Sequence, residues 1–147
     1  MNELEASFAK GKIFNDDRGT LSAFEIPKDF KAKRLYFVSN WKSGFIRAWH
    51  GHFKESKLIT VTQGAGMVAA VPLSEPLNPD KNVKITRQVI TPGDGFFFVP
   101  SAHANGLMSL TSDCKFLIVS SSSLEESIND DFRYPFDYWQ AWNIDQR

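Results

Sequence analysis

The hydrophobic positions of the chain fall in short runs rich in valine, isoleucine, phenylalanine and threonine, and these runs recur along most of its length. Glycine, proline, asparagine and aspartate separate them, which is typical of β-strands joined by turns. No window before residue 124 has the 3.6-residue apolar period of a helix, which excludes the crossover helices of an α/β fold. We expect strands within residues 21–26, 33–40, 44–52, 57–64, 66–73, 83–90, 94–100, 107–112 and 115–122.

An antiparallel sandwich or barrel is the remaining all-β architecture, and the length predicts one domain over residues 1–147. The segment 74–82, SEPLNPDKN, has no apolar pattern and is interpreted as an exposed connection between two strands. After residue 123 the composition becomes acidic and then aromatic. We expect a short helix or an irregular C-terminal tail there, packed back on the barrel.

Charge and composition argue against several classes of function, among them nucleic-acid binding and membrane association. Lysine plus arginine balance aspartate plus glutamate at 17 each, so no net field attracts nucleic acid or an anionic membrane. No apolar run approaches the roughly 18 residues of a membrane span, and the N-terminus lacks a secretion signal, which predicts a cytoplasmic protein. The single cysteine, Cys114, lies in an apolar stretch and is interpreted as a buried thiol.

His50 and His52 are the first candidates for chemistry. Residues two apart on a strand point to the same face, so both imidazole rings can enter one cavity. Taken alone, such a pair is equally compatible with two hydrogen-bonded histidines of a core or rim. The chain then has Lys57 where a third metal ligand would be expected, and its ammonium would repel a metal cation.

The stretch GFIRAWHGHFKESKLITVTQG resembles the first cupin motif, with Gly44, His50, His52 and Gly64 at the spacing of that motif. The stretch PGDGFFFVPSAHAN, which begins at Pro92, resembles the second motif. The resemblance implies a jelly-roll barrel of the cupin superfamily.

Two of the four cupin metal-ligand positions are replaced in this chain. Lys57 stands at the glutamate position of the first motif and Asn105 at the histidine position of the second. We therefore predict a protein with no metal and no other cofactor. His103, two residues before Asn105, shares its strand face and is the side chain that could substitute as a ligand if the loop shifts.

A histidine beside a fixed cation has a definite chemical use. A neutral imidazole can remove a proton next to a ketone, and Lys57, Arg47 or Asn105 could stabilise the enolate oxygen that results. This is the minimum machinery for epimerising or isomerising a keto sugar. Arg47 lies three residues before His50 and so faces the other side of an ideal strand, and it reaches the same cavity only through a bulge or a strand end.

The stretches IRAWHGHFKESKLITVTQG, NDDRGTLSAFE and FVPSAHANGLMSLT together resemble the dTDP-4-dehydrorhamnose 3,5-epimerase family, which are metal-free cupins. The resemblance implies an isomerase that epimerises a nucleotide-linked 4-keto-6-deoxysugar, with dTDP as the nucleotide, for bacterial surface polysaccharides. The roles it implies are His50 as base, Lys57 facing the C4 oxygen, Arg47 binding substrate, Arg18 reaching the diphosphate in a neighbouring subunit, and Asp130 or Asp131 orienting the base. Asn105 and His103 are further candidates for substrate binding, and by their position alone the two aspartates are solvated loop charges.

The chain departs from this family at the general acid, because KFLIVSSSSLEE has serines where the family has a tyrosine. The stretches DDRGTLSAFE, AKRLYFV and RAWHGH resemble a neighbouring cupin family, the dTDP-sugar 3,4-ketoisomerases. That resemblance implies functional roles for His52 and Tyr36, and Tyr36 is a candidate proton donor in either reaction. Ketoisomerisation is thus the alternative activity, and a non-catalytic carbohydrate-binding cupin is the alternative from another class.

A homodimer is the expected assembly. Arg18 serves a neighbour's site by resemblance, and an amino-terminal strand is an exposed edge that can pair with a second chain. The expected partners are therefore a nucleotide-sugar substrate and a second copy of the chain, with neither nucleic acid nor membrane among them.

Overall fold

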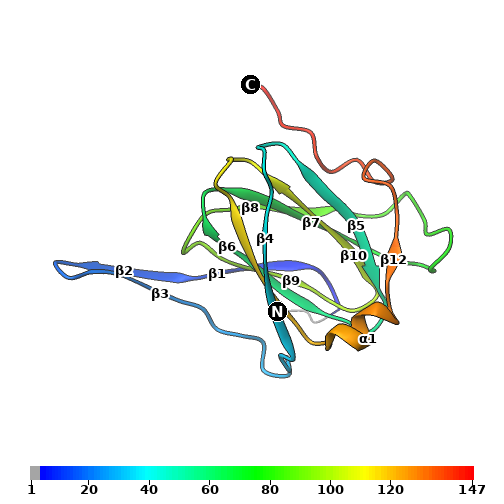
Figure 1. Ribbon diagram of the computed structural model, residues 1–147, viewed down its shortest axis with the longest axis horizontal. Helices are drawn as coiled ribbons and strands as arrows, with labels where there is room; N and C mark the ends of the chain where they lie inside the picture. Colours follow the sequence, from blue (N-terminus) through cyan, green and yellow to red (C-terminus); the bar gives the residue numbers. More distant parts are fainter. Residues whose placement is uncertain (1–3) are drawn as a thin grey trace.

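The computed structural model describes residues 4–147, and two five-stranded antiparallel sheets form its body (Figure 1). One sheet has, in spatial order, β1 (Ser7–Lys10), β9 (Gly95–Val99), β6 (Lys57–Gln63), β11 (Lys115–Ser120) and β4 (Arg34–Ser39). The other has β12 (Phe132–Arg133), β5 (Ile46–His52), β10 (His103–Ser109), β7 (Gly66–Pro72) and β8 (Thr86–Ile90). The expected antiparallel jelly-roll barrel is confirmed.

The core lies between the two sheets, and strand alternation builds it. In β4 the burial alternates residue by residue, so that Tyr36 and Val38 face the interior while Leu35 and Phe37 face outward. The buried interior residues come from both sheets: Ile59, Val61, Val68, Ala70, Ile90, Phe97, Val99, Leu107, Phe116, Ile118 and Cys114. Cys114 is buried there as an apolar thiol, and burial raises its pKa.

The C-terminal segment packs back on the outside of the second sheet, as expected. It begins with the single helical turn α1 (Leu124–Ile128), which Ser123 and Glu126 start with a capping box. Beyond β12, Trp139 packs edge to face on Trp49 of β5, with ring centroids 5.3 Å apart. The tail thus covers the face of β5 opposite the barrel interior and fixes the position of that strand.

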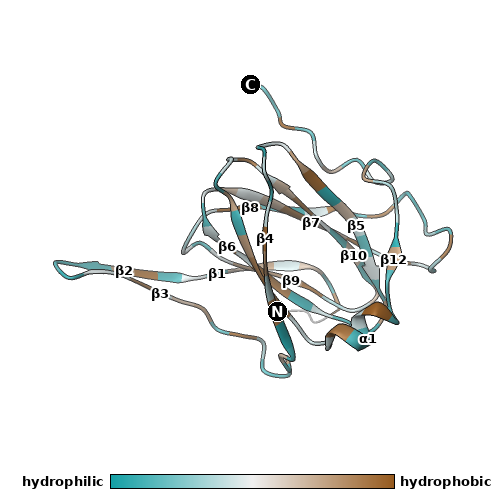
Figure 2. Cartoon of the chain, viewed as in Figure 1, coloured by the Kyte–Doolittle hydropathy of each residue, from teal (hydrophilic) through white to brown (hydrophobic). Residues whose placement is uncertain are grey.

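A long hairpin leaves the body of the molecule at its N-terminal end (Figure 1). It consists of β2 (Lys12–Asp16) and β3 (Gly19–Ala23), whose residues are all exposed. Apolar side chains are among them, and Phe14 is 59% exposed and Leu21 is 58% exposed. Figure 2 shows the hydrophobic positions along β2. Within residues 4–147, no helix is long and apolar enough to cross a membrane.

We expect Trp139→Ala to lower the free energy of unfolding by about 3–5 kcal/mol, because the indole is 1% exposed and its removal leaves a cavity against Trp49. Trp41→Ala is the matched control, since that indole is 100% exposed, and its effect should stay within about 0.5 kcal/mol. Urea unfolding at one protein concentration measures both. Equal effects of the two substitutions would contradict the role given to the tail.

Candidate active site

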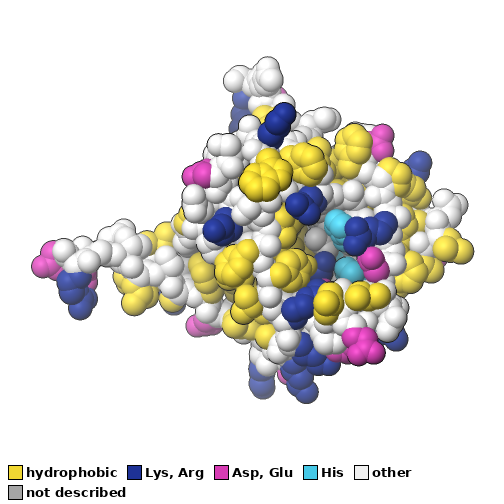
Figure 3. All heavy atoms as spheres, in the orientation of Figure 1, with side chains coloured by type: hydrophobic (Ala, Val, Ile, Leu, Met, Phe, Trp, Pro, Cys, Tyr) yellow, Lys and Arg dark blue, Asp and Glu magenta, His cyan; other side chains and the backbone are white. Residues whose placement is uncertain are grey.

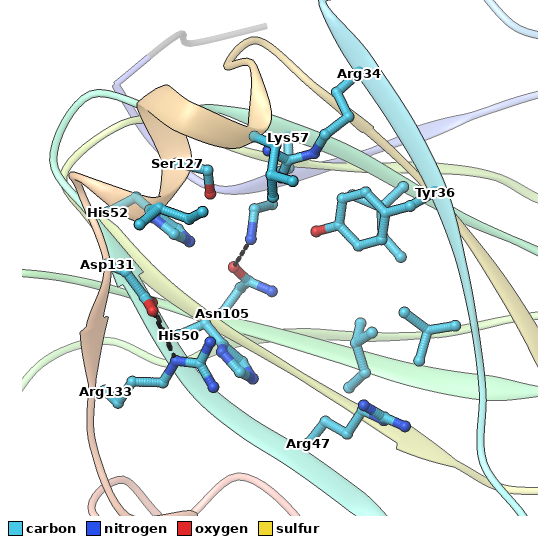
Figure 4. A pocket seen from close by; sticks show the side chains of 15 residues that line it. Arg34, Tyr36, Arg47, His50, His52, Lys57, Asn105, Ser127, Asp131 and Arg133 are labelled. Atoms are coloured by element: carbon cyan, nitrogen blue, oxygen red, sulfur yellow. Dashed lines mark hydrogen bonds and ion pairs between the residues drawn. The ribbon is translucent and has the colours of Figure 1, made fainter.

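A cavity of about 270 Å³ opens at one end of the barrel between the two sheets. Figure 3 shows histidine side chains in a hollow of this face, beside basic and acidic side chains and with hydrophobic ones around them. The polar residues of the wall are Arg34, Tyr36, Arg47, His50, His52, Lys57, Asn105, Ser127, Asp131 and Arg133 (Figure 4). All of them except the asparagine and the serine carry or can carry a charge. The cavity therefore offers cations and imidazoles to a ligand.

A β-bulge in β5 brings Arg47 and His50 to the same cavity. In the ladder between β5 and β10, His50 lies opposite Asn105 and Arg47 lies opposite Leu107, so two intervening residues of β5 face one residue of β10. The extra residue reverses the alternation of side chains along β5, so that Arg47 reaches the same cavity as His50. The sequence predicted that Arg47 could do so only through a bulge or a strand end. Gly106 stands opposite the bulge, where a Cβ atom would lie 2.5 Å from the Cβ of Ala48.

Asn40 holds the guanidinium of Arg47 at the wall of the cavity. The Arg47 Nε donates to Asn40 Oδ1 at 2.6 Å, and the buried Asn40 amide donates to Ser109 Oγ at 2.8 Å. Arg47 thereby keeps its terminal nitrogens for another partner. A guanidinium with free N–H groups suits a carboxylate or phosphate ligand.

Lys57 is a buried cation at the start of β6. Its Nζ donates to Asn105 Oδ1 at 3.3 Å and lies 3.9 Å from Glu55 Oε2 (Figure 4). Burial lowers the pKa of Lys57 to about 8, although the Glu55 carboxylate acts in the opposite direction. The side chain is therefore an ammonium at neutral pH, and its charge opposes protonation of the histidines beside it.

His50 is neutral over most of the pH range. Burial, together with the positive charges of Arg133 and Lys57, lowers the pKa of its imidazole to about 4. Asp131 opposes this shift, and its carboxylate accepts from Arg133 Nε at 3.1 Å. An unprotonated imidazole beside an ammonium is the state that a base needs in order to take a proton from carbon.

The main chain fixes the second histidine. His52 Nδ1 lies 2.5 Å from the carbonyl oxygen of Asp130, and because a carbonyl only accepts, Nδ1 carries the proton. Burial lowers the pKa of His52 as well, with Lys57 acting in the same direction. In its neutral form the ring therefore has its free lone pair at Nε2.

The two aspartates that follow α1 have different surroundings. The Asp130 carboxylate accepts from the backbone N–H groups of Phe53 and Lys54 at 2.8 Å each and of Glu55 at 3.1 Å. It holds the turn between β5 and β6 and is directed at that turn rather than at His50. Of the two, Asp131 is the one whose side chain lines the cavity.

Tyr36 lies on β4, across the cavity from His50 and Asn105 (Figure 4). The Arg34 guanidinium lies 5.1 Å from the centre of its ring. Burial, followed by the charge of Glu55, raises the pKa of the phenol, so Tyr36 keeps its proton at neutral pH. A protonated phenol thus stands on the wall opposite the neutral His50 imidazole.

Two of the expected substrate-binding residues lie outside this cavity. Arg18 is in the turn of the β2–β3 hairpin, exposed, and paired with the Asp16 carboxylate at 2.5 Å. His103 begins β10 and lines a separate pocket near Leu4 and Lys84, where its Nδ1 lies 2.9 Å from the carbonyl oxygen of Ser101. The chain's own Arg18 therefore belongs to a different part of the molecule from His50.

Three charged residues around the site were not among those chosen from the sequence. Arg34 shares the inward face of β4 with Tyr36. Their spacing of two residues on a strand could have identified Arg34 from the sequence. Arg133 lies opposite His50 in the β5–β12 ladder, and no sequence pattern indicates that pairing. Glu55 is buried behind Lys57, in the turn that precedes β6, where no strand alternation indicates the direction of its side chain.

Comparison with known proteins identifies the family of the chain. The family profile described as FdtA, "WxcM-like, C-terminal", matches residues 5–141. No curated protein sequence matches the chain significantly.

Several solved structures with the same fold are sugar-nucleotide isomerases of low sequence identity. The dTDP-4-dehydrorhamnose 3,5-epimerase of Bacillus anthracis, with TDP and PPi bound, is 19% identical over 93% of this chain and 82% of its own, with a TM-score of 0.78. The 3,4-ketoisomerase QdtA of Thermoanaerobacterium thermosaccharolyticum, a histidine-to-asparagine mutant in complex with TDP-4-keto-6-deoxyglucose, is 19% identical over 90% of each chain, with a TM-score of 0.67. The TDP-quinovose 3,4-ketoisomerase of Campylobacter jejuni is 15% identical over 92% of this chain and 98% of its own, with a TM-score of 0.69.

The cavity does not provide the donor set of a metal site. His50 and His52 are two neutral donors, but the third position holds the Lys57 ammonium, which repels a divalent cation. Within residues 4–147, no group of three or more histidine, cysteine, aspartate or glutamate side chains is placed to hold a metal ion. The residues present fit an anionic ligand better than a metal.

We expect purified protein to contain no stoichiometric transition metal, and we expect Lys57→Glu to bind about one zinc or nickel ion per chain, because it completes a three-ligand site. Lys54→Glu, an exposed charge reversal in the same turn, is the control and should bind none. Metal analysis after dialysis against each ion measures the difference. Stoichiometric metal at His50 and His52 in the unmodified protein would contradict the assignment.

Proposed function

The chain belongs to the family of WxcM-like C-terminal (FdtA) domains, and on that basis we propose that it is a metal-free epimerase of a nucleotide-linked 4-keto-6-deoxysugar. The single observation that supports this most strongly is the pair formed by a neutral His50 and a charged Lys57 in one cavity. A base next to a fixed cation is suited to removing a proton beside a ketone, because the cation stabilises the enolate that forms.

The reaction follows from the placement of these groups. His50 takes the proton from the carbon beside the ketone, and the C–H electron pair moves into an enolate whose oxygen faces the Lys57 ammonium. The Tyr36 hydroxyl, on the opposite wall, then returns a proton to the other face of the same carbon. The product has the inverted configuration, and a solvent-derived proton restores the phenol while His50 releases the one it took.

The charges of the cavity also suit the nucleotide part of the substrate. Arg47 and Arg133 line the same wall and supply guanidinium groups for a diphosphate. Two of the solved structures described above contain TDP or a TDP-sugar, which supports dTDP as the nucleotide here. Arg18 is proposed to reach the diphosphate of a neighbouring subunit, because its hairpin extends away from the chain's own cavity.

A second reaction, 3,4-ketoisomerisation, is favoured by a separate observation. Both His50 and His52 line the cavity, and β11 carries no tyrosine. Moving a ketone from C4 to C3 requires proton transfers on neighbouring atoms, which two imidazoles on one strand face can perform. The two reactions share the first proton abstraction and differ in the atom to which the proton returns. Identifying the product therefore distinguishes epimerisation from ketoisomerisation.

We expect the protein to introduce solvent deuterium into the sugar carbon beside the ketone, and His50→Ala to slow this exchange by about 10²- to 10⁴-fold, because the base is lost. The measurement is NMR in deuterated water with nucleotide-linked 4-keto-6-deoxysugars, and the product shows either an inverted carbon or a 3-ketone. His103→Ala is the control, since that imidazole lies outside the cavity.

Near-native exchange in His50→Ala would make His52 or Tyr36 the better candidate for the base. A protein that binds these sugars and leaves them without label would instead be a non-catalytic carbohydrate-binding cupin. Tight binding with no exchange would therefore contradict the proposed enzyme activity.

We expect a homodimer in solution, because the β2–β3 hairpin exposes apolar side chains that a second copy can cover. Phe14→Asp should shift the molecule toward the monomer, since it places a charge on that surface. Asn15→Asp adds the same carboxylate at the neighbouring position and should leave the dimer intact. Light scattering at micromolar concentration measures both, and a monomeric, active wild-type protein would rule out a shared site.

A further inference from the structure

Glu55 is a buried carboxylate directly behind the cavity, in the turn between β5 and β6. Its side chain is 0% exposed. Oε2 accepts from the Ser120 hydroxyl at 2.7 Å and lies 3.5 Å from an Arg34 terminal nitrogen and 3.9 Å from Lys57 Nζ. The proposed mechanism gives this residue no part, although a fully buried charge needs such partners to be stable.

The second oxygen of Glu55 lies next to a histidine. Oε1 is 3.6 Å from His52 Nδ1, and within residues 4–147 it has no hydrogen-bond partner. The His52 Nδ1–H group points to the carbonyl oxygen of Asp130, so the carboxylate sits beside an N–H group already in use. A negative charge at this distance favours the tautomer with the proton on Nδ1.

We propose that Glu55 is a positioning residue that holds Lys57 as an ammonium and His52 as the Nδ1–H tautomer, so that the Lys57 charge and the His52 Nε2 lone pair both face the substrate. The effect of this arrangement on catalysis rests on the proposed function. The ionic arrangement itself is a property of the ligand-free protein and is testable without a substrate.

The charges around Lys57 show why the Glu55 carboxylate is the main group that keeps Lys57 protonated. The charged or titratable groups that face it are Glu55, Asp131, Arg34, Arg133, His50, His52 and Tyr36. Asp131 is paired with Arg133, and Arg34 adds a further positive charge beside Lys57. Burial and the two guanidiniums lower the pKa of Lys57, and Glu55 is the strongest group that raises it.

Glu55→Gln is the sharpest test, because it keeps the shape of the side chain and removes its charge. The amide has one oxygen, so it can accept from Ser120 or face the His52 N–H group, but not both. We expect a wild-type titration midpoint of Lys57 of about 8, observed by NMR of its labelled ε-carbon, and a midpoint about one to three pH units lower in Glu55→Gln. Glu125→Gln, the same change on the exposed face of α1, should leave the midpoint unchanged.

A separate measurement keeps the inference testable if Glu55→Gln does not fold. In the wild-type protein, the nitrogen shifts of His52 should show the proton on Nδ1 throughout the neutral range. A proton on Nε2, or a Lys57 midpoint that Glu55→Gln leaves unchanged, would overturn the inference.

Kinetics separate this inference from the proposed function. If the protein turns over a keto sugar, the alkaline limit of the rate should move to lower pH in Glu55→Gln together with the Lys57 midpoint. A uniform loss of rate with the limit unmoved would indicate a merely structural role and contradict the inference. A displaced Lys57 midpoint in a protein that turns over no nucleotide sugar would support the inference and count against the proposed function alone.

Discussion

The structure of the site depends on the burial of the Lys57 ammonium. A charge removed from water requires partners, and Glu55 and Asn105 provide a carboxylate and an amide oxygen within 4 Å. Burial, Arg133 and then this same charge lower the pKa of His50 and keep its imidazole neutral. One lysine in the place of a metal ligand thus puts a cation beside a neutral imidazole in a single cavity, which is the combination that proton abstraction beside a ketone requires.

The barrel makes this arrangement possible through two features of β5. The bulge before His50 turns Arg47 into the cavity, and the aromatic tail covers the outer face of the strand at Trp49. The turn that follows β5 is held by the Asp130 carboxylate, which fixes the approach of Glu55 to Lys57. Packing far from the cavity therefore sets the geometry inside it, and changes there should reach the site through the position of β5.

The sequence predicted the parts of the structure that depend on local periodicity. Strand alternation gave the shared face of His50 and His52, and the shift needed for Arg47 was foreseen as a bulge. The strands β1 and β2 were not among the expected runs, because their residues pack little or not at all on the core. Arg133 was missed, and the sequence could not decide between Asp130 and Asp131, since these positions follow from how the tail pairs with β5, which is a long-range contact without a local pattern.

The central claim is that Lys57 acts as a cation while His50 acts as the base. The pH dependence of solvent deuterium exchange by the wild-type protein tests it most directly. His50 loses its proton as the pH rises through about 4, and Lys57 loses its own as the pH rises through about 8, so exchange should be fastest between these values and fall on both sides. A rate that instead increases through pH 8 would show that neutral Lys57 is the base and would contradict the account.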